Sequence, residues 1–265
     1  MSIHKTEAIV LRRFDFRETS LIVNFFTRDF GKISGILKGI RVDPKKFASP
    51  CELFSHNEII FYRKRNSALH LVSQADVRGH FNSNRQDLQK CAVASLMMEL
   101  IAAVCAQEDK NEEIFDLALL CLKELETTYK PEKIATIFKI KALGLSGFQP
   151  HFTSCVSCAV TIPYQAKFSL GLGGLLCPKC VSKDASARSV FRGTIASILH
   201  IQNNTFTSTL TLGLNPQIKR ELDQLLNAFI RFHLERELKS QKVLAAINDK
   251  EISYEDSYSG AGSNW

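Results

Sequence analysis

The chain has 265 residues, 45% of them hydrophobic, which suffices for about one large domain or two to three small ones. It contains no run of 18 or more apolar residues, so we expect no membrane span. The net charge of +7 is concentrated in residues 1–80, where 14 lysines and arginines face 8 aspartates and glutamates, and this favours a polyanionic partner. An inert basic surface is the alternative.

The first residues carry no export signal that we can identify. Residues 1–9 include His4, Lys5 and Glu7 and lack a long apolar core. The eight cysteines therefore fit a reducing cytoplasm. Four of them lie singly inside apolar segments and are interpreted as small buried hydrophobic residues: Cys51, Cys91, Cys105 and Cys121.

Residues 1–80 predict β structure, because short apolar runs rich in β-branched and aromatic residues alternate with polar turns. The predicted strands are Ala8–Leu11, Leu21–Phe26, Ile33–Leu37, Glu58–Tyr62 and Leu69–Val72. An open sheet this small would leave its edges exposed, so the pattern favours a closed barrel. The five-stranded oligonucleotide-binding barrel, or OB-fold, has this size and strand count.

From about Asn84 the apolar residues recur every three or four positions, which predicts helices. The first predicted helix continues to Val104 and is apolar around most of its circumference, so we expect it to pack on more than one side. The second covers Glu112–Tyr129. Pro131 suits the first turn of a third helix, which ends in the Gly144–Gly147 region.

Two C-x-x-C pairs interrupt the helical pattern. Cys155 and Cys158 are separated from Cys177 and Cys180 by residues 159–176, a spacing typical of zinc sites. Two thiolates on one tight turn can bind a single ion, and a second pair completes the tetrahedral four-sulfur shell that zinc prefers. We therefore predict a structural Zn²⁺ bound by these four cysteines. Such a shell leaves no open position for water, so a catalytic zinc is not expected.

Other uses of the cysteine pairs stay open at this point. A redox dithiol is normally a single C-x-x-C in another structural setting, and disulfides require an oxidising compartment. Four free thiols are a further alternative, because some folds keep a zinc loop after losing the metal. The metal content of the purified protein separates these readings.

Helices are predicted again near Ser189 and over Pro216–Leu238, where apolar residues form a broad face. The sequence after Asp249 is rich in serine, glycine and acidic residues, which is typical of a mobile tail. The predicted architecture is α+β and multidomain: an OB-type barrel at 1–80, a helical domain at 81–249 with the cysteine insertion at 151–182, and a tail at 250–265.

Five stretches carry a resemblance through their order and spacing. They are E-A-I-V-L at 7–11, F-R-E-T-S-L-I at 16–22, T-R-D-F-G-K-I at 27–33, K-G-I-R at 38–41 and L-G-L-S-G-F-Q-P at 143–150. With the cysteine pairs, they resemble the RecO family of DNA repair and recombination mediators over most of residues 1–182. The chain departs from the family pattern at Asp43, which dilutes the basic cluster after the K-G-I-R stretch.

The resemblance implies a protein that binds single- and double-stranded DNA, anneals complementary strands and helps to load a recombinase onto coated single strands. It implies RecR and single-stranded-DNA-binding protein as partners, RecA as an indirect partner, and a cytoplasmic, nucleoid-associated location in bacteria. It implies no enzymatic activity. The residues agree, because the histidines are scattered and no phosphate-binding G-x-x-x-x-G-K-[ST] loop occurs.

The cations predicted to contact DNA lie around the third strand and at a later turn: Lys32, Lys38, Arg41, Lys45, Lys46, Arg63, Lys64 and Arg65. Contacts with phosphates would release counterions and make the affinity depend on salt. Four phenylalanines are candidates to stack on unpaired bases: Phe14, Phe16, Phe30 and Phe47. A solvated charged face and ordinary core packing are the respective alternatives.

The helical domain is expected to carry a partner site. The C-terminal tail of single-stranded-DNA-binding protein is acidic and ends in an aromatic residue, so a pocket with apolar walls and a basic rim would suit it. Arg188, Arg192, Lys219 and Arg220 are the candidates for that rim, with ordinary surface charges as the alternative. Two other classes of function remain open: an RNA-binding factor, and a protein-interaction module that binds no nucleic acid.

Overall fold

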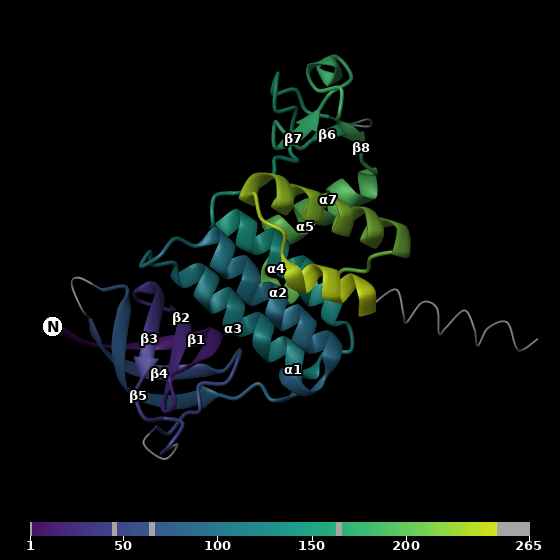
Figure 1. Ribbon diagram of the computed structural model, residues 1–265. Helices are drawn as coiled ribbons and strands as arrows, with labels where there is room; N and C mark the ends of the chain where they lie inside the picture. The colour runs from purple at the N-terminus through teal and green to yellow at the C-terminus, as the bar shows by residue number, and fades with distance from the viewer. Residues whose placement is uncertain (1, 44–46, 64–66, 163–165, 248–265) are drawn as a thin grey trace, which may run out of the picture.

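The computed structural model describes residues 2–43, 47–63, 67–162 and 166–247. It has an N-terminal five-stranded part, a helical body and a small three-stranded sheet that carries the cysteine pairs. The helical body lies in the middle, and the other two parts lie at its opposite ends (Figure 1). The chain is thus α+β, with the β structure first, as predicted from the sequence.

The N-terminal strands close into a barrel. They are β1 (Ser2–Phe16), β2 (Ser20–Thr27), β3 (Gly31–Leu37), β4 (His56–Arg63) and β5 (Leu69–Gly79). The barrel order is β1-β2-β3-β5-β4, and β1 pairs with both β2 and β4. All neighbouring strands are antiparallel except β3 and β5, which run parallel.

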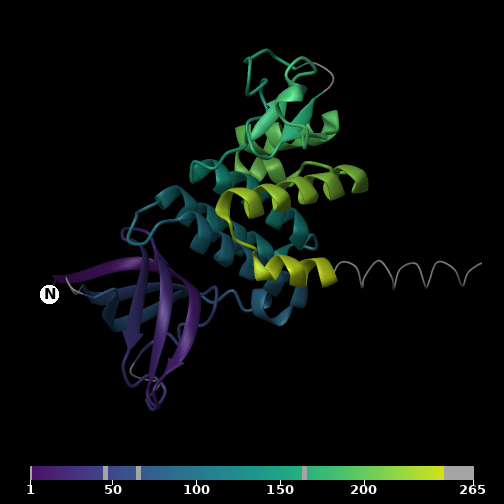
Figure 2. The same cartoon turned by 45° about the horizontal axis from the view of Figure 1, so that its top comes forward.

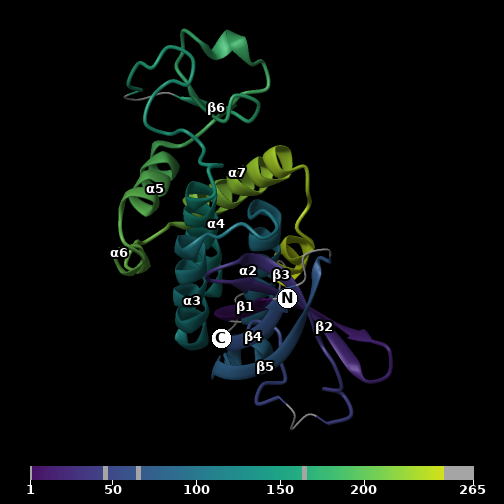
Figure 3. The same cartoon turned by 90° about the vertical axis from the view of Figure 1, so that its left-hand side faces the viewer.

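β1 is much longer than the predicted strand, because it pairs with two neighbouring strands. Residues 2–9 pair with β4, and residues 8–16 pair with β2 with a register shift between Val10 and Arg12. The residues after Leu11 are polar or exposed, so the apolar pattern did not reveal them as strand. The β1–β2 hairpin projects away from the helical body (Figures 2 and 3).

Side chains that alternate along the strands fill two different cores. Leu21, Val23 and Phe25 of β2 lie in a cluster inside the barrel. Phe26 points the other way and packs against Phe115 of the body, with ring centroids 6.0 Å apart. The barrel and the body therefore share a continuous apolar contact.

The body contains α1 (Ser83–Gln86), α2 (Leu88–Val104), α3 (Glu112–Thr127), α4 (Pro131–Leu145), α5 (Arg192–Asn203), α6 (Phe206–Leu210) and α7 (Pro216–Leu234). Side-chain caps explain several helix starts, because Asp87, Asn111 and Asn215 each accept a hydrogen bond from the backbone N–H three residues later. Pro131 and Pro216 both lie in the first helical turn.

The C-terminal helices differ from the prediction of one helix over Pro216–Leu238. α7 ends at Leu234, because Glu235 adopts a left-handed conformation with φ 49°. A further helix covers residues 239–247, which the sequence pattern did not indicate. The carboxylate of Glu99 accepts hydrogen bonds from the backbone and hydroxyl of Ser240 and fixes this helix against α2.

The cysteine segment forms β6 (Lys167–Ser169), β7 (Gly174–Leu176) and a short 3-10 turn (Val181–Lys183), followed by β8 (Arg188–Ser189). β6 is the central strand and pairs antiparallel with β7 and β8. The helix predicted to begin near Ser189 begins at Arg192 instead, because β8 takes up the residues before it. Within the described ranges, we find no helix with the length and apolarity needed to cross a bilayer.

Candidate metal centre and nucleic-acid surface

The four paired cysteines converge at one point of the small sheet. The sulfur atoms of Cys155, Cys158, Cys177 and Cys180 all lie within 4.8 Å of one another. The Sγ atoms of Cys158 and Cys177 are 3.7 Å apart. A disulfide requires about 2.05 Å between sulfurs, so these thiols are free. The two C-x-x-C turns predicted from the sequence, which we call the cysteine knuckles, therefore face each other across a single small space.

This spacing suits a tetrahedral zinc ion. A Zn–S bond of about 2.3 Å in tetrahedral geometry places the ligand sulfurs about 3.8 Å apart. Two of the cysteines are buried, one is half-buried and only Cys158 is exposed, so most of the donor set is shielded from solvent. The residues present fit the ion that the sequence predicts, and Zn²⁺ bound here would cross-link the two knuckles.

Backbone N–H groups favour the ionised form of the Cys155 thiol. Burial raises the pKa of Cys155, but hydrogen bonds from the backbone N–H groups of Cys177, Ser157 and Cys158 outweigh it and lower the pKa to about 6. Cys158 receives a hydrogen bond from Val160, yet the neighbouring thiols raise its pKa to about 11. Several thiolates in this space repel one another, and a bound divalent cation would remove that repulsion.

The centre is tied to its surroundings through close backbone contacts. Gly174 accepts no side chain, because an added Cβ would lie 2.4 Å from the Val156 side chain and 2.6 Å from the His151 carbonyl oxygen. The backbone of His151 bonds to Gly173 and Leu175. This close approach holds the segment before the first cysteine pair against the strand that leads to the second.

The predicted DNA-binding cations separate into two groups at opposite ends of the barrel. Lys38 and Arg41 follow β3 at the end that carries the β1–β2 turn. Arg41 donates from Nη1 to the Arg17 carbonyl at 2.9 Å, and its Nη2 lies 3.3 Å from Asp15. Both cations are exposed to solvent at this end.

Lys32 and Arg63 lie at the other end, beside the helical body. Lys32 Nζ donates to the Ala102 carbonyl at 2.6 Å, and burial lowers its pKa. Arg63 forms an ion pair with Glu108. These two side chains thus contact the body. The remaining predicted contacts, Lys45, Lys46, Lys64 and Arg65, lie outside the described residues.

One arginine that sequence reasoning did not select, Arg17, lies beside Arg41, which donates to its carbonyl oxygen. Arg12 and Arg13 lie on the second half of β1, and Arg17 lies in the turn that follows. The Arg17 guanidinium sits over the Phe16 ring, 5.3 Å from its centroid. Arg12 and Arg13 contact other parts of the chain instead: Arg12 lies 3.9 Å from Glu99 of α2, and Arg13 donates to the Pro50 carbonyl.

Two of the predicted partner residues line a groove between β8, the segment that leads into α5, and α7. Two adjoining hollows of about 140 and 610 Å³ share Glu221 and Gln224. Their apolar walls come from Phe168, Leu170, Val190, Phe191 and Leu225, and we call this surface the α5–α7 groove.

Arg188 and Arg220 line the two hollows of the α5–α7 groove. Arg192 is exposed at the first position of α5. Lys219 instead pairs with Glu132 of α4 at 2.8 Å. Glu221 accepts hydrogen bonds from the Phe191 backbone N–H and the Thr194 hydroxyl, so it caps the start of α5.

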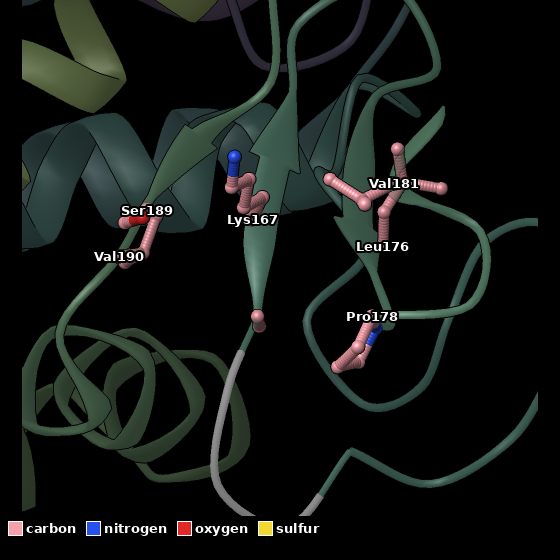
Figure 4. A pocket seen from close by; sticks show the side chains of 7 residues that line it. Lys167, Leu176, Pro178, Val181, Ser189 and Val190 are labelled. Atoms are coloured by element: carbon pink, nitrogen blue, oxygen red, sulfur yellow. The ribbon is translucent and has the colours of Figure 1, made fainter. Parts of the chain in front are cut away.

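A separate pocket of about 420 Å³ lies over the small sheet. Lys167 projects from β6, beside Ser189 of the neighbouring strand, while Leu176, Pro178 and Val181 supply the apolar side (Figure 4). Because Pro178 lies between Cys177 and Cys180, the shape of this pocket depends on the second cysteine knuckle.

Both halves of the chain match profiles of a known protein family. The family profile described as recombination protein O N terminal matches residues 1–81, and the one described as recombination protein O C terminal matches residues 85–242. Among curated relatives, "DNA repair protein RecO" of Syntrophus aciditrophicus is 32% identical over 251 residues, covering 92% of this chain and 96% of the relative.

Other curated relatives cover a similar share of the chain. "DNA repair protein RecO" of Desulfatibacillum aliphaticivorans is 30% identical over 245 residues, covering 90% of this chain and 95% of the relative. The protein of that name from Dehalococcoides mccartyi is 31% identical over 240 residues, covering 89% and 92% respectively. The similarity therefore includes the barrel, the helical body and the cysteine segment together.

Proposed function

Because the chain belongs to the RecO family of DNA repair proteins, with a general role in recombinational repair, we propose that it binds DNA through its barrel and anneals complementary strands. The observation that supports this most is the set of cations at the free end of the barrel. Arg17, Lys38 and Arg41 lie in the turns at the end of the barrel where β1 and β2 are joined.

The barrel topology is consistent with an OB-type module. Its order is β1-β2-β3-β5-β4, with β1 closing the sheet and β3 parallel to β5. Modules of this type bind oligonucleotides across the face of strands 2 and 3 and through the neighbouring loops. We accordingly treat 1–80 as the nucleic-acid domain and 81–249 as a helical domain with the cysteine insertion at 151–182. The proposed tail at 250–265 lies outside the described residues.

Annealing on this surface needs no bond making. Two complementary strands repel each other through their phosphates, and cations that screen both strands lower the barrier to their meeting. Arg17 extends the cationic area beyond the two residues predicted on this end. Lys32 and Arg63 are not part of the proposed DNA-binding surface, because their side chains already contact the body.

The cysteine centre is proposed to hold a structural Zn²⁺. Four thiolate ligands would complete the coordination shell, so the ion would stabilise the small sheet and take no part in a reaction. The Lys167 pocket and the groove wall at Phe168 both adjoin this sheet, so loss of the ion would disturb each of them.

The α5–α7 groove is proposed as the site for the acidic, aromatic-ended tail of single-stranded-DNA-binding protein. Its walls are apolar, and Arg188 and Arg220 lie at its rim, with Arg192 nearby. Binding there would bring the protein to coated single strands, where it would work with RecR to load RecA. Of the four predicted residues, Lys219 has the least support as a contact for the tail, because it pairs with Glu132.

A strand-annealing assay tests the proposal. Complementary oligonucleotides coated with single-stranded-DNA-binding protein should anneal faster when the full chain is added, and the acceleration should fall as salt rises. Arg220→Glu should reduce annealing of coated strands and leave annealing of naked strands unchanged. Equal rates with and without the protein, on naked strands in dilute buffer, would refute the proposal.

A further inference from the structure

Two arginines of the α5–α7 groove have no acidic partner in the ranges that the structure describes. Arg188 lines the smaller hollow and Arg220 the larger one, and neither guanidinium forms an ion pair there. The lining carboxylate, Glu221, already accepts hydrogen bonds from the Phe191 backbone and the Thr194 hydroxyl. The groove therefore offers positive charge to a ligand that brings its own carboxylates, and arginine clusters commonly bind acidic peptide motifs.

Apolar surface lies beside these charges. Phe191 is 54% exposed and lines the larger hollow. Leu170, Val190 and Leu225 line the smaller one. A peptide that combines carboxylates with apolar or aromatic side chains would cover both kinds of surface.

The chain itself contains a segment of this composition. Residues 251–258 read E-I-S-Y-E-D-S-Y, with three carboxylates, one isoleucine, two tyrosines and neither lysine nor arginine. This is an acidic stretch in a chain whose net charge is +7. The segment lies outside the described residues and begins four positions after the helix at 239–247 ends.

The helix at 239–247 leads toward the groove. It runs back beneath α7 and ends on the side of the body where α7 begins (Figures 1 and 2). The larger hollow is lined from the start of α7, by Asn215, Pro216 and Gln217 among others. An extended chain covers about 3.4 Å per residue, so Tyr254 and Tyr258 can lie up to about 24 and 37 Å beyond the end of this helix.

We propose that residues 251–258 occupy the α5–α7 groove in the free protein and compete there with the tail of single-stranded-DNA-binding protein. The inference rests on the proposed use of the groove as a site for an acidic tail, and it adds an internal competitor for that site. Glu255 and Asp256 would pair with Arg188 and Arg220, and a neighbouring tyrosine would cover Phe191.

The tether makes even a weak internal ligand effective. A short flexible connection gives the segment an effective concentration in the millimolar range. If this exceeds the intrinsic Kd of the segment about tenfold, the groove is free in only about a tenth of the molecules, and the affinity for an external peptide falls about tenfold. The protein would then engage coated strands strongly only where many tails are presented.

Peptide binding to the full chain provides the first test. The probe is a fluorescein-labelled peptide from the C-terminal tail of single-stranded-DNA-binding protein, measured by anisotropy. Glu255→Lys/Asp256→Lys should raise the affinity for this peptide about tenfold, because the groove is released. Glu18→Lys/Glu113→Lys is the matched control, since it reverses the same charges at exposed positions of the β1–β2 turn and of α3, and it should change the affinity less than twofold.

Photo-cross-linking locates the segment directly. With p-benzoylphenylalanine in place of Tyr254, the unliganded full chain should cross-link to residues 186–191 and 215–225, and an excess of the tail peptide should suppress these products. Cross-links confined to other surfaces would refute the internal occupant, whatever the peptide does.

The peptide results separate this inference from the function on which it rests. If the wild type and Glu255→Lys/Asp256→Lys bind the peptide equally well and Arg220→Glu weakens it, the internal competitor is refuted and the groove remains the tail site. If the peptide binds none of these proteins, both the tail site and the competition are refuted.

Discussion

Removal of two cations at the free end of the barrel should weaken DNA binding and reduce its dependence on salt. Lys38 and Arg41 are exposed there, and Arg41 is oriented by the Arg17 carbonyl and by Asp15. Each phosphate contact with a single strand contributes about 0.7 to the slope of log affinity against log salt. The double variant Lys38→Gln/Arg41→Gln should therefore lower the slope by about 1.4.

This change in slope is large enough to measure. Between about 50 and 200 mM salt, the wild type should lose about sevenfold more single-strand affinity than the double variant loses. Anisotropy titrations with a labelled oligo-dT at four or five salt concentrations give both slopes. Thermal melts of the two proteins should coincide, because neither side chain is buried.

Lys123→Gln/Lys130→Gln is the matched control, because it removes the same charge from exposed positions of the helical body. Its slope should equal that of the wild type. Equal slopes for the wild type and the Lys38/Arg41 double variant would refute the reasoning, since those cations would then contact no phosphate. Equal losses in both double variants would show that only net charge matters.

Three further predictions concern stability and the metal. The purified protein should contain about one zinc per chain by mass spectrometry, and Cys177→Ser should lose it while Cys91→Ser keeps it; metal near zero in the wild type, with stability unaffected by a chelator, contradicts the site. Gly174→Ala should destabilise the fold by about 1–3 kcal/mol in urea unfolding, because its methyl group would meet neighbours at 2.4 and 2.6 Å, whereas Gly171→Ala has open space and should cost far less; similar midpoints for both would contradict the packing. Burial lowers the pKa of Lys139 below its usual 10.5, so at pH values between the folded-state pKa and 10.5 the unfolded chain binds one more proton than the folded chain. The wild type should therefore gain unfolding free energy relative to Lys139→Met as pH rises toward 10.5; a difference that is constant with pH would show that the pKa is not lowered.

The strand and helix pattern was predictable wherever one face of an element is buried. The alternation in Leu21–Phe26 and the helical period after Asn84 both appear as elements in the structure. The second half of β1 was not predictable in this way. Residues 12–16 extend beyond the core and hold only two alternating apolar residues, Phe14 and Phe16, although they complete the hairpin on which the DNA-binding proposal depends.

The cysteine cluster was easier to predict from the sequence than the cationic surface. The two-residue gap within each C-x-x-C motif brings its two cysteines together. The only further assumption was that the two short turns approach each other. A cationic surface depends on which strand ends meet. Lys32 and Lys38 are six residues apart in sequence, yet β3 places them at opposite ends of the barrel, where Lys32 contacts the Ala102 carbonyl of the body.

The break between α7 and the helix at 239–247 had no signal in the apolar period. Leu234 and Leu238 continue the spacing of the preceding apolar face, but Glu235 takes a left-handed conformation without a glycine. The contact between Ser240 and Glu99, which are 141 residues apart, accompanies this change of direction. Tertiary contacts of this kind override local helical preference.

Photochemical cross-linking of a single-stranded oligonucleotide to the full chain, with the linked peptides identified by mass spectrometry, tests the location of the DNA most directly. Cross-links should concentrate on residues 12–17 and 36–41, with Phe14 among the modified positions, and should fade as salt increases. Cross-links confined to the small cysteine sheet or to the helices of the body would contradict the assignment of DNA binding to the barrel.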